Sequence, residues 1–474
     1  MTWTPRPAQA AARQMLREQA RAGVRRLCVV MPTGAGKTHL AAWTIADQLR
    51  AGLHPVVVTH RREIMRQWRA TLAEHGADPR AVTWRTHQTR TPLVLPAEPS
   101  RCVIWIDEAH LYYDAIQRLQ AEHGGGASGA CAPWWVLLTA TPTRLDGSPM
   151  SAVCDAIVEP TDARTLVAEG ALVPPRVICA ESPELHDVPI RAGDYAAGGL
   201  ALAYRSPALV GSIVETWRQR ARQPDGSVRP TLLFAASVEQ SRSLVAALGP
   251  GWAHVDGSTP RAERDATWAR LEAGDLDGVA SVQLAIEGID VRRVSCVVWA
   301  TATMSLSRWR QGCGRAARSW PGKADYLVID HGGNAWEHGY PDAPVEWTLD
   351  GRAPSPGGAS LRTCTECLAM YDAAEAEDGC CPRCGAAPEV QQRQPKRVID
   401  AELREVTAAE LERRRRDVSR DTPPRPPPAW LPERWHQAWT RNEETRQREG
   451  YALPYGGAGG WSEGRARWVM RRNQ

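Results

Sequence analysis

Short apolar runs recur along the chain, and each is followed directly by a cluster of polar residues. The runs lie at residues 27–30, 56–58, 102–106, 135–138, 232–234, 279–282, 297–300 and 326–329. Between them, apolar residues recur at helical spacing. Strands that alternate with helices form parallel, doubly wound sheets, and ligands bind at the carboxyl ends of their strands. The polar clusters lie at those ends in both halves of the chain, so the pattern predicts an α/β protein with two parallel sheets in tandem.

Composition divides the 474 residues into four predicted parts. These are an N-terminal α/β domain over 1–150, a second α/β domain over 160–352, a cysteine module over 361–388 and a basic, partly helical tail over 389–474. The expected connecting segments are a glycine-rich flexible loop at 124–129, a hinge at 146–159, a Pro/Gly/Ser linker at 353–360 and a polyproline-like spacer at 422–428.

A phosphate-binding loop is predicted between the first apolar run and the helix that follows it. Its glycines let the backbone turn tightly, so that its N–H groups and the helix N-terminus face a polyphosphate. Lys37 would reach the β- and γ-phosphates, and the Thr38 hydroxyl would bind Mg²⁺. The residues expected to bind the nucleotide are Pro32, Thr33, Gly34, Ala35, Gly36, Lys37 and Thr38. The loop departs from the usual pattern at Met31, where a glycine is expected.

The use of lysine supports this interpretation. Among 58 lysines and arginines only Lys37, Lys323 and Lys396 are lysines. A chain that uses arginine almost everywhere keeps lysine where a compact ammonium must sit among phosphates.

Two acids and two arginines complete a predicted hydrolytic site. Asp107 and Glu108 end an apolar run, so that one can hold Mg²⁺ while the other orients the attacking water. Arg315 and Arg318, three residues apart on a predicted helix, would face one way and neutralise charge on the transferred phosphoryl group. Upstream, Gln9 carries an amide that can both donate to and accept from an adenine edge.

Taken together, these motifs resemble those of the superfamily-two DEAD/DEAH-box helicases, close to the branch of type III restriction subunits and phage DNA helicases. The motifs, in order, are Asp-Glu-Ala-His at 107–110, Thr-Ala-Thr-Pro at 139–142, Glu-Gly-Ile-Asp at 287–290 and the stretch from Gln311 to Arg318. The resemblance implies two RecA-like domains with ATP between them, and it covers about residues 5–351. The RNA-helicase branch has a different adenine motif and a serine in the third motif, so DNA is favoured as the partner.

The resemblance also assigns roles to particular residues. It implies that Gln9 contacts adenine, and that Gln311 belongs to the catalytic motif of Arg315 and Arg318. Thr139 and Thr141 would couple the state of ATP to nucleic acid. Further implied contacts are those of Gly288 and Asp290 with ATP and of Arg61 with backbone phosphates.

Four cysteines form a second constellation, with Cys364-x₂-Cys367 and Cys381-x₂-Cys384 separated by 13 residues. Two such pairs suit a tetrahedral Zn²⁺ site, and the metal would then supply most of the module's folding free energy. A disulfide pair and inert thiols are the alternatives, and the neighbouring Cys380 complicates the choice of ligands.

The tail carries the basic excess. From residue 389 onward 18 basic residues face 13 acidic ones, whereas the whole chain has a net charge of +4. Its arginine run at 413–416 is either a solvated helix face or a contact for the nucleic-acid backbone. Its tryptophans, Trp430, Trp435, Trp439, Trp461 and Trp468, either stack on bases or pack a small helical module.

No apolar run is long enough to span a membrane, and residues 1–17 lack the core of a signal peptide, so a cytoplasmic protein with reduced cysteines and no membrane partner is expected. No lysine has an acid two residues before it, which excludes a metal nuclease of the Asp/Glu-x-Lys type.

The leading hypothesis is an ATP-dependent DNA helicase or translocase of phage or prophage replication, recombination or repair, with proteins of those processes as possible partners. The alternatives are an ATP-switched DNA-binding recruitment factor and the motor subunit of a restriction or defence system with its nuclease on another chain.

Overall fold

The computed structural model describes residues 3–386, apart from 88, 90–91, 124–131, 144–147, 180–184, 186–187, 192, 224, 283–290, 350–360, 365, 368, 373–375 and 377–379. The chain divides into two compact units, Met1–Glu389 and Val390–Gln474. The predicted glycine loop, the linker at 353–360 and every prediction on the tail therefore lie outside the described residues.

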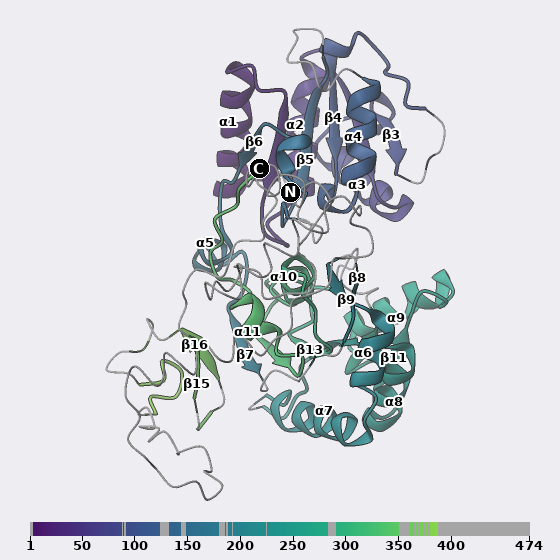
Figure 1. Cartoon of the computed structure of the whole chain (residues 1–474). Helices are drawn as coiled ribbons and strands as arrows, with labels where there is room; N and C mark the ends of the chain where they lie inside the picture. Colours follow the sequence, from purple (N-terminus) through teal and green to yellow (C-terminus); the bar gives the residue numbers. More distant parts are fainter. Residues whose placement is uncertain are drawn as a thin grey trace, which may run out of the picture. The chain divides into compact units, whose positions relative to one another are not determined.

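The first sheet has six parallel strands in the order β3-β2-β4-β5-β1-β6. They are β1 Arg26–Val30, β2 His54–Thr59, β3 Thr83–Thr86, β4 Cys102–Ile106, β5 Trp134–Thr139 and β6 Ala156–Val158. The helices that accompany them are α1 Pro7–Arg21, α2 Lys37–Arg50, α3 Arg62–Glu74 and α4 Tyr113–Glu122 (Figure 1). Short 3₁₀ helices lie at Pro79–Ala81, Pro99–Arg101, Ala109–Leu111 and Met150–Ala152.

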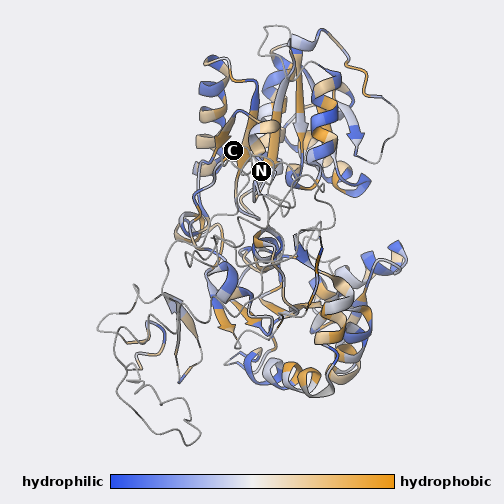
Figure 2. Ribbon diagram, in the orientation of Figure 1, coloured by the Kyte–Doolittle hydropathy of each residue, from blue (hydrophilic) through white to orange (hydrophobic). Residues whose placement is uncertain are grey.

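Side chains of the first sheet alternate between two apolar clusters, one on each face. In β1, Leu27 and Val29 pack in the cluster that includes α1, α2 and α3, whereas Cys28 and Val30 pack in the cluster that includes α4. A parallel sheet must bury both of its faces, which is why its strands are almost continuously apolar. Figure 2 shows the apolar residues concentrated in the strands.

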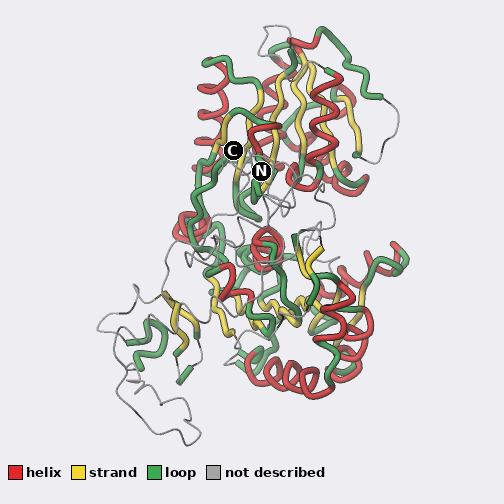
Figure 3. The backbone as a smooth tube through the Cα atoms, viewed as in Figure 1, coloured by secondary structure: helices red, strands yellow, loops and turns green. Residues whose placement is uncertain are grey.

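The second sheet repeats this design with six parallel strands in the order β11-β12-β10-β13-β14-β7. The strands are β7 Pro175–Cys179, β10 Thr231–Ala235, β11 Trp252–Val255, β12 Gly278–Ser281, β13 Cys296–Ala300 and β14 Tyr326–Asp330. The helices are α5 Ala163–Ala168, α6 Ala197–Ala203, α7 Pro207–Arg220, α8 Val238–Leu248, α9 Arg261–Ala273, α10 Leu306–Gly314 and α11 Asn334–His338, and a small hairpin joins β8 Ile190–Arg191 to β9 Asp194–Tyr195 (Figure 3). The predicted fold class of two tandem parallel sheets is confirmed.

The sequence pattern missed the edge strands. Strands β3, β6, β7 and β11 were not expected, and β6 lies inside the stretch 146–159 that was predicted to be a hinge, where it pairs with β1. Edge strands have one partner and short apolar runs, so periodicity alone signals them weakly. No helix among the described residues is long and apolar enough to cross a membrane.

The cysteine module contains one antiparallel pair, β15 Leu361–Thr363 and β16 Met370–Asp372. It attaches to the edge of the second sheet, where Ala369 forms an antiparallel bridge with Ile178 of β7. The Tyr340 hydroxyl donates a hydrogen bond of 2.9 Å to the Met370 carbonyl, and Arg383 Nη2 lies 3.3 Å from Asp325 Oδ2. The module is thus held against the second sheet by main-chain, hydroxyl and charged contacts.

Candidate functional site

The predicted phosphate loop connects β1 to α2 and requires its glycines. Gly34 and Gly36 both have a φ of 87°, in the left-handed region that L side chains avoid. Gly36 is the N-cap of α2, so the first N–H groups of that helix have no partner within the helix. This is the backbone geometry that an anion-binding loop needs.

Lys37 points back along this loop. Its Nζ donates to the carbonyl oxygens of Met31 at 3.0 Å and Pro32 at 3.4 Å. Burial lowers the pKa of Lys37, and the carboxylates of Glu108 and Asp107 partly offset this effect. The Lys37 ammonium is therefore hydrogen-bonded to two loop carbonyls and is favoured by the charges of two nearby carboxylates.

Gln9 is buried against the loop, and its amide is engaged on both sides. The Arg6 N–H donates to Gln9 Oε1 at 2.9 Å, while Gln9 Nε2 donates to the Gly36 carbonyl at 3.1 Å. A Cβ placed on Gly36 would lie 2.4 Å from Gln9 Nε2, so a larger residue would displace the Gln9 amide as well as strain the backbone. The predicted contact of Gln9 with adenine stays a prediction.

Asp107 and Glu108 follow β4 at the carboxyl edge of the first sheet. Asp107 Oδ2 accepts a hydrogen bond of 3.2 Å from Trp68 Nε1, and Asp107 Oδ1 accepts one of 3.1 Å from the Glu108 N–H. Glu108 has a φ of 47° and is the one non-glycine residue with positive φ in the described part of the chain. Such a backbone costs about 1–2 kcal/mol.

The two acids differ in their electrostatic environment. Burial, reinforced by the charge of Glu108, raises the pKa of Asp107 to about 7. Burial also opposes ionisation of Glu108, but the cationic Lys37 and the neighbouring His110 and Arg315 together lower the pKa of Glu108. Glu108 Oε2 is buried and lies 3.6 Å from His110 Nδ1, and among the described residues it has no hydrogen-bond partner.

Arg315 and Arg318 reach the same region, but not from a helix. Helix α10 ends at Gly314, and Arg315 is its C-cap. Beyond it, Arg318 forms an antiparallel bridge with Leu172, so the prediction that both arginines share one helix face is wrong. Glycines at 312 and 314 weaken the helix, and the backbone beyond it pairs with the chain before β7 instead.

Arg318 nevertheless packs against the phosphate loop. A Cβ placed on Gly34 would lie 3.3 Å from Arg318 Cγ. The charges of Arg315 and Arg318 both act to lower the pKa of Lys37. Gly314 also approaches the loop closely, because a Cβ at that position would lie 2.9 Å from Thr33 Cβ.

A chain of polar contacts joins the remaining motifs. Thr139 Oγ1 lies 3.0 Å from His110 Nδ1, and His110 Nε2 lies 3.1 Å from Gln311 Nε2. Gln311 Nε2 lies 3.3 Å from Ser307 Oγ, whose other neighbour is Thr141 Oγ1 at 2.6 Å. The sequence predicts roles for Gln311, Thr139 and Thr141 but not for His110 or Ser307, although His110 belongs to the Asp-Glu-Ala-His motif.

Arg61 and the Glu-Gly-Ile-Asp motif at 287–290 are the remaining predicted sites. Arg61 is the N-cap of α3 and is partly exposed at the carboxyl end of β2. Gly288 and Asp290 lie outside the described residues, so their predicted contacts stay predictions.

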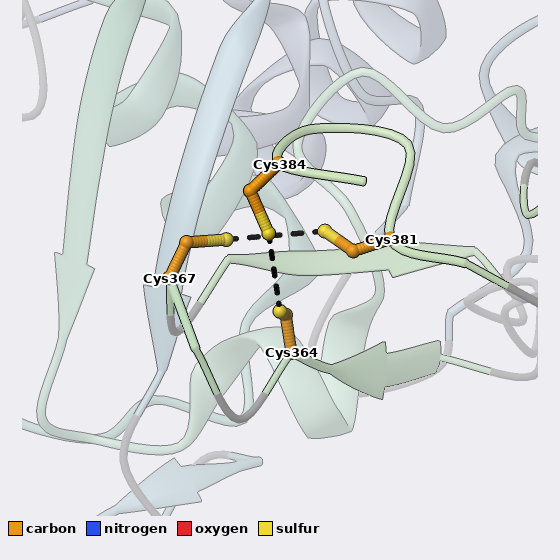
Figure 4. Close-up of side chains that lie close together, drawn as sticks. All are labelled: Cys364, Cys367, Cys381 and Cys384. Atoms are coloured by element: carbon orange, nitrogen blue, oxygen red, sulfur yellow. Dashed lines mark hydrogen bonds between the residues drawn. The ribbon is translucent and has the colours of Figure 1, made fainter. Parts of the chain in front are cut away.

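The four cysteines converge as a metal site requires (Figure 4). The Sγ atoms of Cys364, Cys367, Cys381 and Cys384 all lie within 4.8 Å of one another. Cys364 Sγ lies 3.6 Å from Cys384 Sγ, and Cys367 Sγ lies 3.8 Å from Cys381 Sγ. Four sulfurs at about 2.3 Å from a tetrahedral Zn²⁺ stand about 3.8 Å apart, so the donor set and its spacing fit zinc. Cys380 is not part of the cluster, and all described cysteines are free thiols.

Two α/β domains in tandem, with a phosphate loop on one and arginines of the other beside it, form the fold that the helicase resemblance implies. Residues 2–92 match the family described as "Type III restriction enzyme, res subunit", and residues 223–319 match the "Helicase conserved C-terminal domain". The resemblance to superfamily-two helicases and restriction-enzyme motors is thereby confirmed.

Individual relatives agree with these domains. A "51.5 kDa protein" of a Lactococcus phage is 24% identical over 385 residues, which span 78% of this chain and 80% of the phage protein. A "Putative DNA 3'-5' helicase Rad25" of Halobacterium salinarum is 27% identical over 66% of this chain, and the match spans about half, 52%, of that relative. The solved fragment of a "putative HsdR subunit of a type I restriction enzyme" from Vibrio vulnificus has a TM-score of 0.52 at 18% identity, covering 74% of this chain and 67% of the fragment, and it shares the fold.

Proposed function

We propose that this protein is an ATP-dependent DNA helicase or translocase, in which Mg-ATP hydrolysis drives movement along or unwinding of DNA. The observation that carries the proposal is the packing of Arg318, which follows α10, against Gly34 of the phosphate loop. A site that draws residues from both sheets can link hydrolysis to a change in how the two domains contact each other.

In this mechanism the loop backbone and Lys37 hold the β- and γ-phosphates. Thr38 and Asp107 would hold Mg²⁺, and the ion would supply positive charge that neutralises the phosphate oxygens. Glu108, kept ionised by its cationic neighbours, orients the attacking water with its carboxylate. Arg315 and Arg318 stabilise the charge that develops on the transferred phosphoryl group, an effect worth about 10³–10⁵ in rate.

The contacts of His110 support a route from this site to DNA. His110 is two residues from Glu108 and contacts both Thr139 and Gln311. We infer that loss of the γ-phosphate shifts Glu108 and His110, and that Thr139, Thr141 and Gln311 pass the shift to both domains. Arg61, at the end of β2, would then hold or release a backbone phosphate of the DNA strand.

The test compares the wild type with Lys37→Ala and Arg315→Ala in ATP hydrolysis with and without single-stranded DNA, and in unwinding of forked duplexes with either tail polarity. We expect DNA-stimulated hydrolysis in the wild type and a loss of about 100-fold or more in both variants. Undiminished hydrolysis in either variant would refute this mechanism. ATP-dependent binding and release of DNA without unwinding or translocation would favour a recruitment switch.

A second candidate is the motor subunit of a restriction or defence system whose nuclease lies on another chain. The match of residues 2–92 to the type III restriction subunit family favours it. Expression together with the products of neighbouring genes tests it, because a motor subunit would co-purify with a nuclease and drive ATP-dependent DNA cleavage.

A further inference from the structure

Lys323 lies five residues after Arg318 and makes an unusual set of contacts. Its Nζ lies 2.8 Å from the carbonyl oxygen of Arg318 and 2.5 Å from that of Val294. The Arg292 carbonyl is a third acceptor at 3.3 Å. Three acceptors match the three N–H donors of an ammonium.

These acceptors belong to two separate segments of the second α/β domain. Arg318 closes the stretch whose arginines approach the phosphate loop, whereas Arg292 and Val294 lie directly before β13. The Lys323 ammonium therefore ties the backbone of one segment to the other through main-chain oxygens alone.

The opposite side of the Arg318 backbone is also fixed. The Val173 N–H donates to the Ala317 carbonyl at 2.8 Å, and Leu172 bridges Arg318. With the Leu172–Val173 segment on one side and Lys323 on the other, the direction in which the Arg318 side chain leaves the backbone is determined. That direction leads to Gly34.

We propose that Lys323 is a positioning residue for Arg318, which holds the backbone of that arginine so that its guanidinium meets the phosphoryl group. The proposal rests on the function proposed above. Lysine suits the position because its compact ammonium can satisfy converging carbonyls, whereas the planar fork of a guanidinium cannot. This explains a lysine at this position in a chain that uses arginine almost everywhere else.

The surroundings of Lys323 disfavour a charged ammonium. Burial, with the charges of Arg318 and Arg229, lowers the pKa of Lys323 to about 7. The three carbonyl acceptors and the negative charge of Glu272 favour the ammonium form of Lys323.

The experiment is a double-mutant cycle on DNA-stimulated ATP hydrolysis with Lys323→Met, Arg318→Ala and both together. A misplaced catalytic group costs about 10²-fold in rate, so we expect Lys323→Met to lower kcat by about 10- to 100-fold. Affinity for a non-hydrolysable ATP analogue should stay within about twofold, because the loop contacts are untouched. In the Arg318→Ala background Lys323→Met should cause no further loss, since Lys323 acts through Arg318.

Arg80→Met serves as the control for loss of a basic side chain, since Arg80 is exposed and pairs only locally with Asp78; its kcat should equal that of the wild type. If Lys323→Met melts more than about 5 °C below the wild type, Lys323→Arg, which keeps the charge, takes its place with the same expected outcomes. The inference would be overturned if the losses of the two single variants multiplied in the double variant. It would also be overturned if Lys323→Met kept the kcat of the wild type while Arg318→Ala lost activity. A wild type without DNA-stimulated hydrolysis, or an Arg318→Ala variant with normal kcat, would instead overturn the proposed function.

Discussion

The amide nitrogen of Gln311 lies 3.1 Å from Nε2 of His110 and joins α10 to the segment that follows β4. Because an amide nitrogen only donates, His110 Nε2 must accept, and the proton of a neutral ring then resides on Nδ1. That proton points to Thr139 Oγ1 at 3.0 Å, which also accepts from the Thr141 N–H. Burial lowers the pKa of His110, which is consistent with the neutral ring that this arrangement requires.

The first prediction concerns this pair. His110→Ala and Gln311→Ala should each reduce the stimulation of ATP hydrolysis by DNA about 5- to 50-fold while changing hydrolysis without DNA much less. Because the two side chains contact each other, the double variant should lose less than the product of the single losses, with a coupling of about 0.5–3 kcal/mol. Steady-state hydrolysis over a DNA titration measures all four proteins, and independent, multiplicative effects would contradict the contact.

The second prediction concerns the approach of Gly314 to Thr33. A Cβ at position 314 would lie 2.9 Å from Thr33 Cβ, so Gly314→Ala should force the segment before Arg315 away from the phosphate loop. Overpacking of this kind costs about 1–3 kcal/mol. We expect the Kd of ATP to rise about tenfold, measured by titration with a fluorescent analogue.

Gly211→Ala is the matched control for this variant. Gly211 lies within α7, and an added Cβ there would meet nothing within 4 Å. The same substitution should leave the Kd of ATP unchanged and raise the free energy of unfolding by about 0.5–1 kcal/mol. Equal ATP affinities for the two alanine variants would show that the close approach at Gly314 does not matter for binding.

The third prediction is that the cysteine cluster holds one zinc ion per chain. Elemental analysis of the purified protein should give one equivalent of zinc, and Cys364→Ser should lose it, whereas Cys380→Ser should keep it because Cys380 lies outside the cluster. Removal of the ion with a strong chelator should make residues 361–386 sensitive to protease, since a structural zinc contributes about 10–16 kcal/mol to such modules. A full equivalent of zinc in Cys364→Ser, or none in the wild type, would disprove the site.

The fourth prediction follows from His331, directly after β14. Burial lowers the pKa of this ring from 6.5 to about 4. Between these pH values the unfolded chain binds a proton that the folded chain does not, so folding stability falls as the pH drops from 6.5 to 4. The loss from this one group amounts to at most about 3 kcal/mol.

His331→Gln tests this assignment in urea unfolding at pH 7 and pH 4.5. The variant lacks the titrating ring, so its free energy of unfolding should improve relative to that of the wild type at the lower pH. A difference between the two proteins that is the same at both pH values would show that His331 does not titrate in this way.

Much of the fold could be predicted because central parallel strands are nearly uniform apolar runs. The run at 27–30 became β1, an interior strand of its sheet, and glycines at 34 and 36 have the positive φ that a phosphate loop needs. The cluster of four cysteines could likewise be predicted, since two Cys-x₂-Cys pairs in a small module are typical of one shared metal site.

The rest depended on relationships between distant segments. Nothing local in the sequence shows that Glu108 adopts a φ of 47°, because such a conformation persists only where the surrounding structure imposes it. The end of α10 at Gly314 could not be located by spacing, since the pairing of Arg318 with Leu172 competes with one more helical turn. The contacts of His110 with Thr139 and Gln311 likewise join segments that are distant in the sequence, so spacing could not predict them.

The bridge between Ala369 and Ile178 has a consequence for how the protein behaves in solution. Strand β7 lies at the margin of the second sheet, and its outer N–H and C=O groups are a template for pairing with another chain. The cysteine module covers part of that sheet edge, so it blocks pairing of β7 with a strand of another molecule. A chain cut before residue 361 would therefore be expected to aggregate even with its nucleotide site intact.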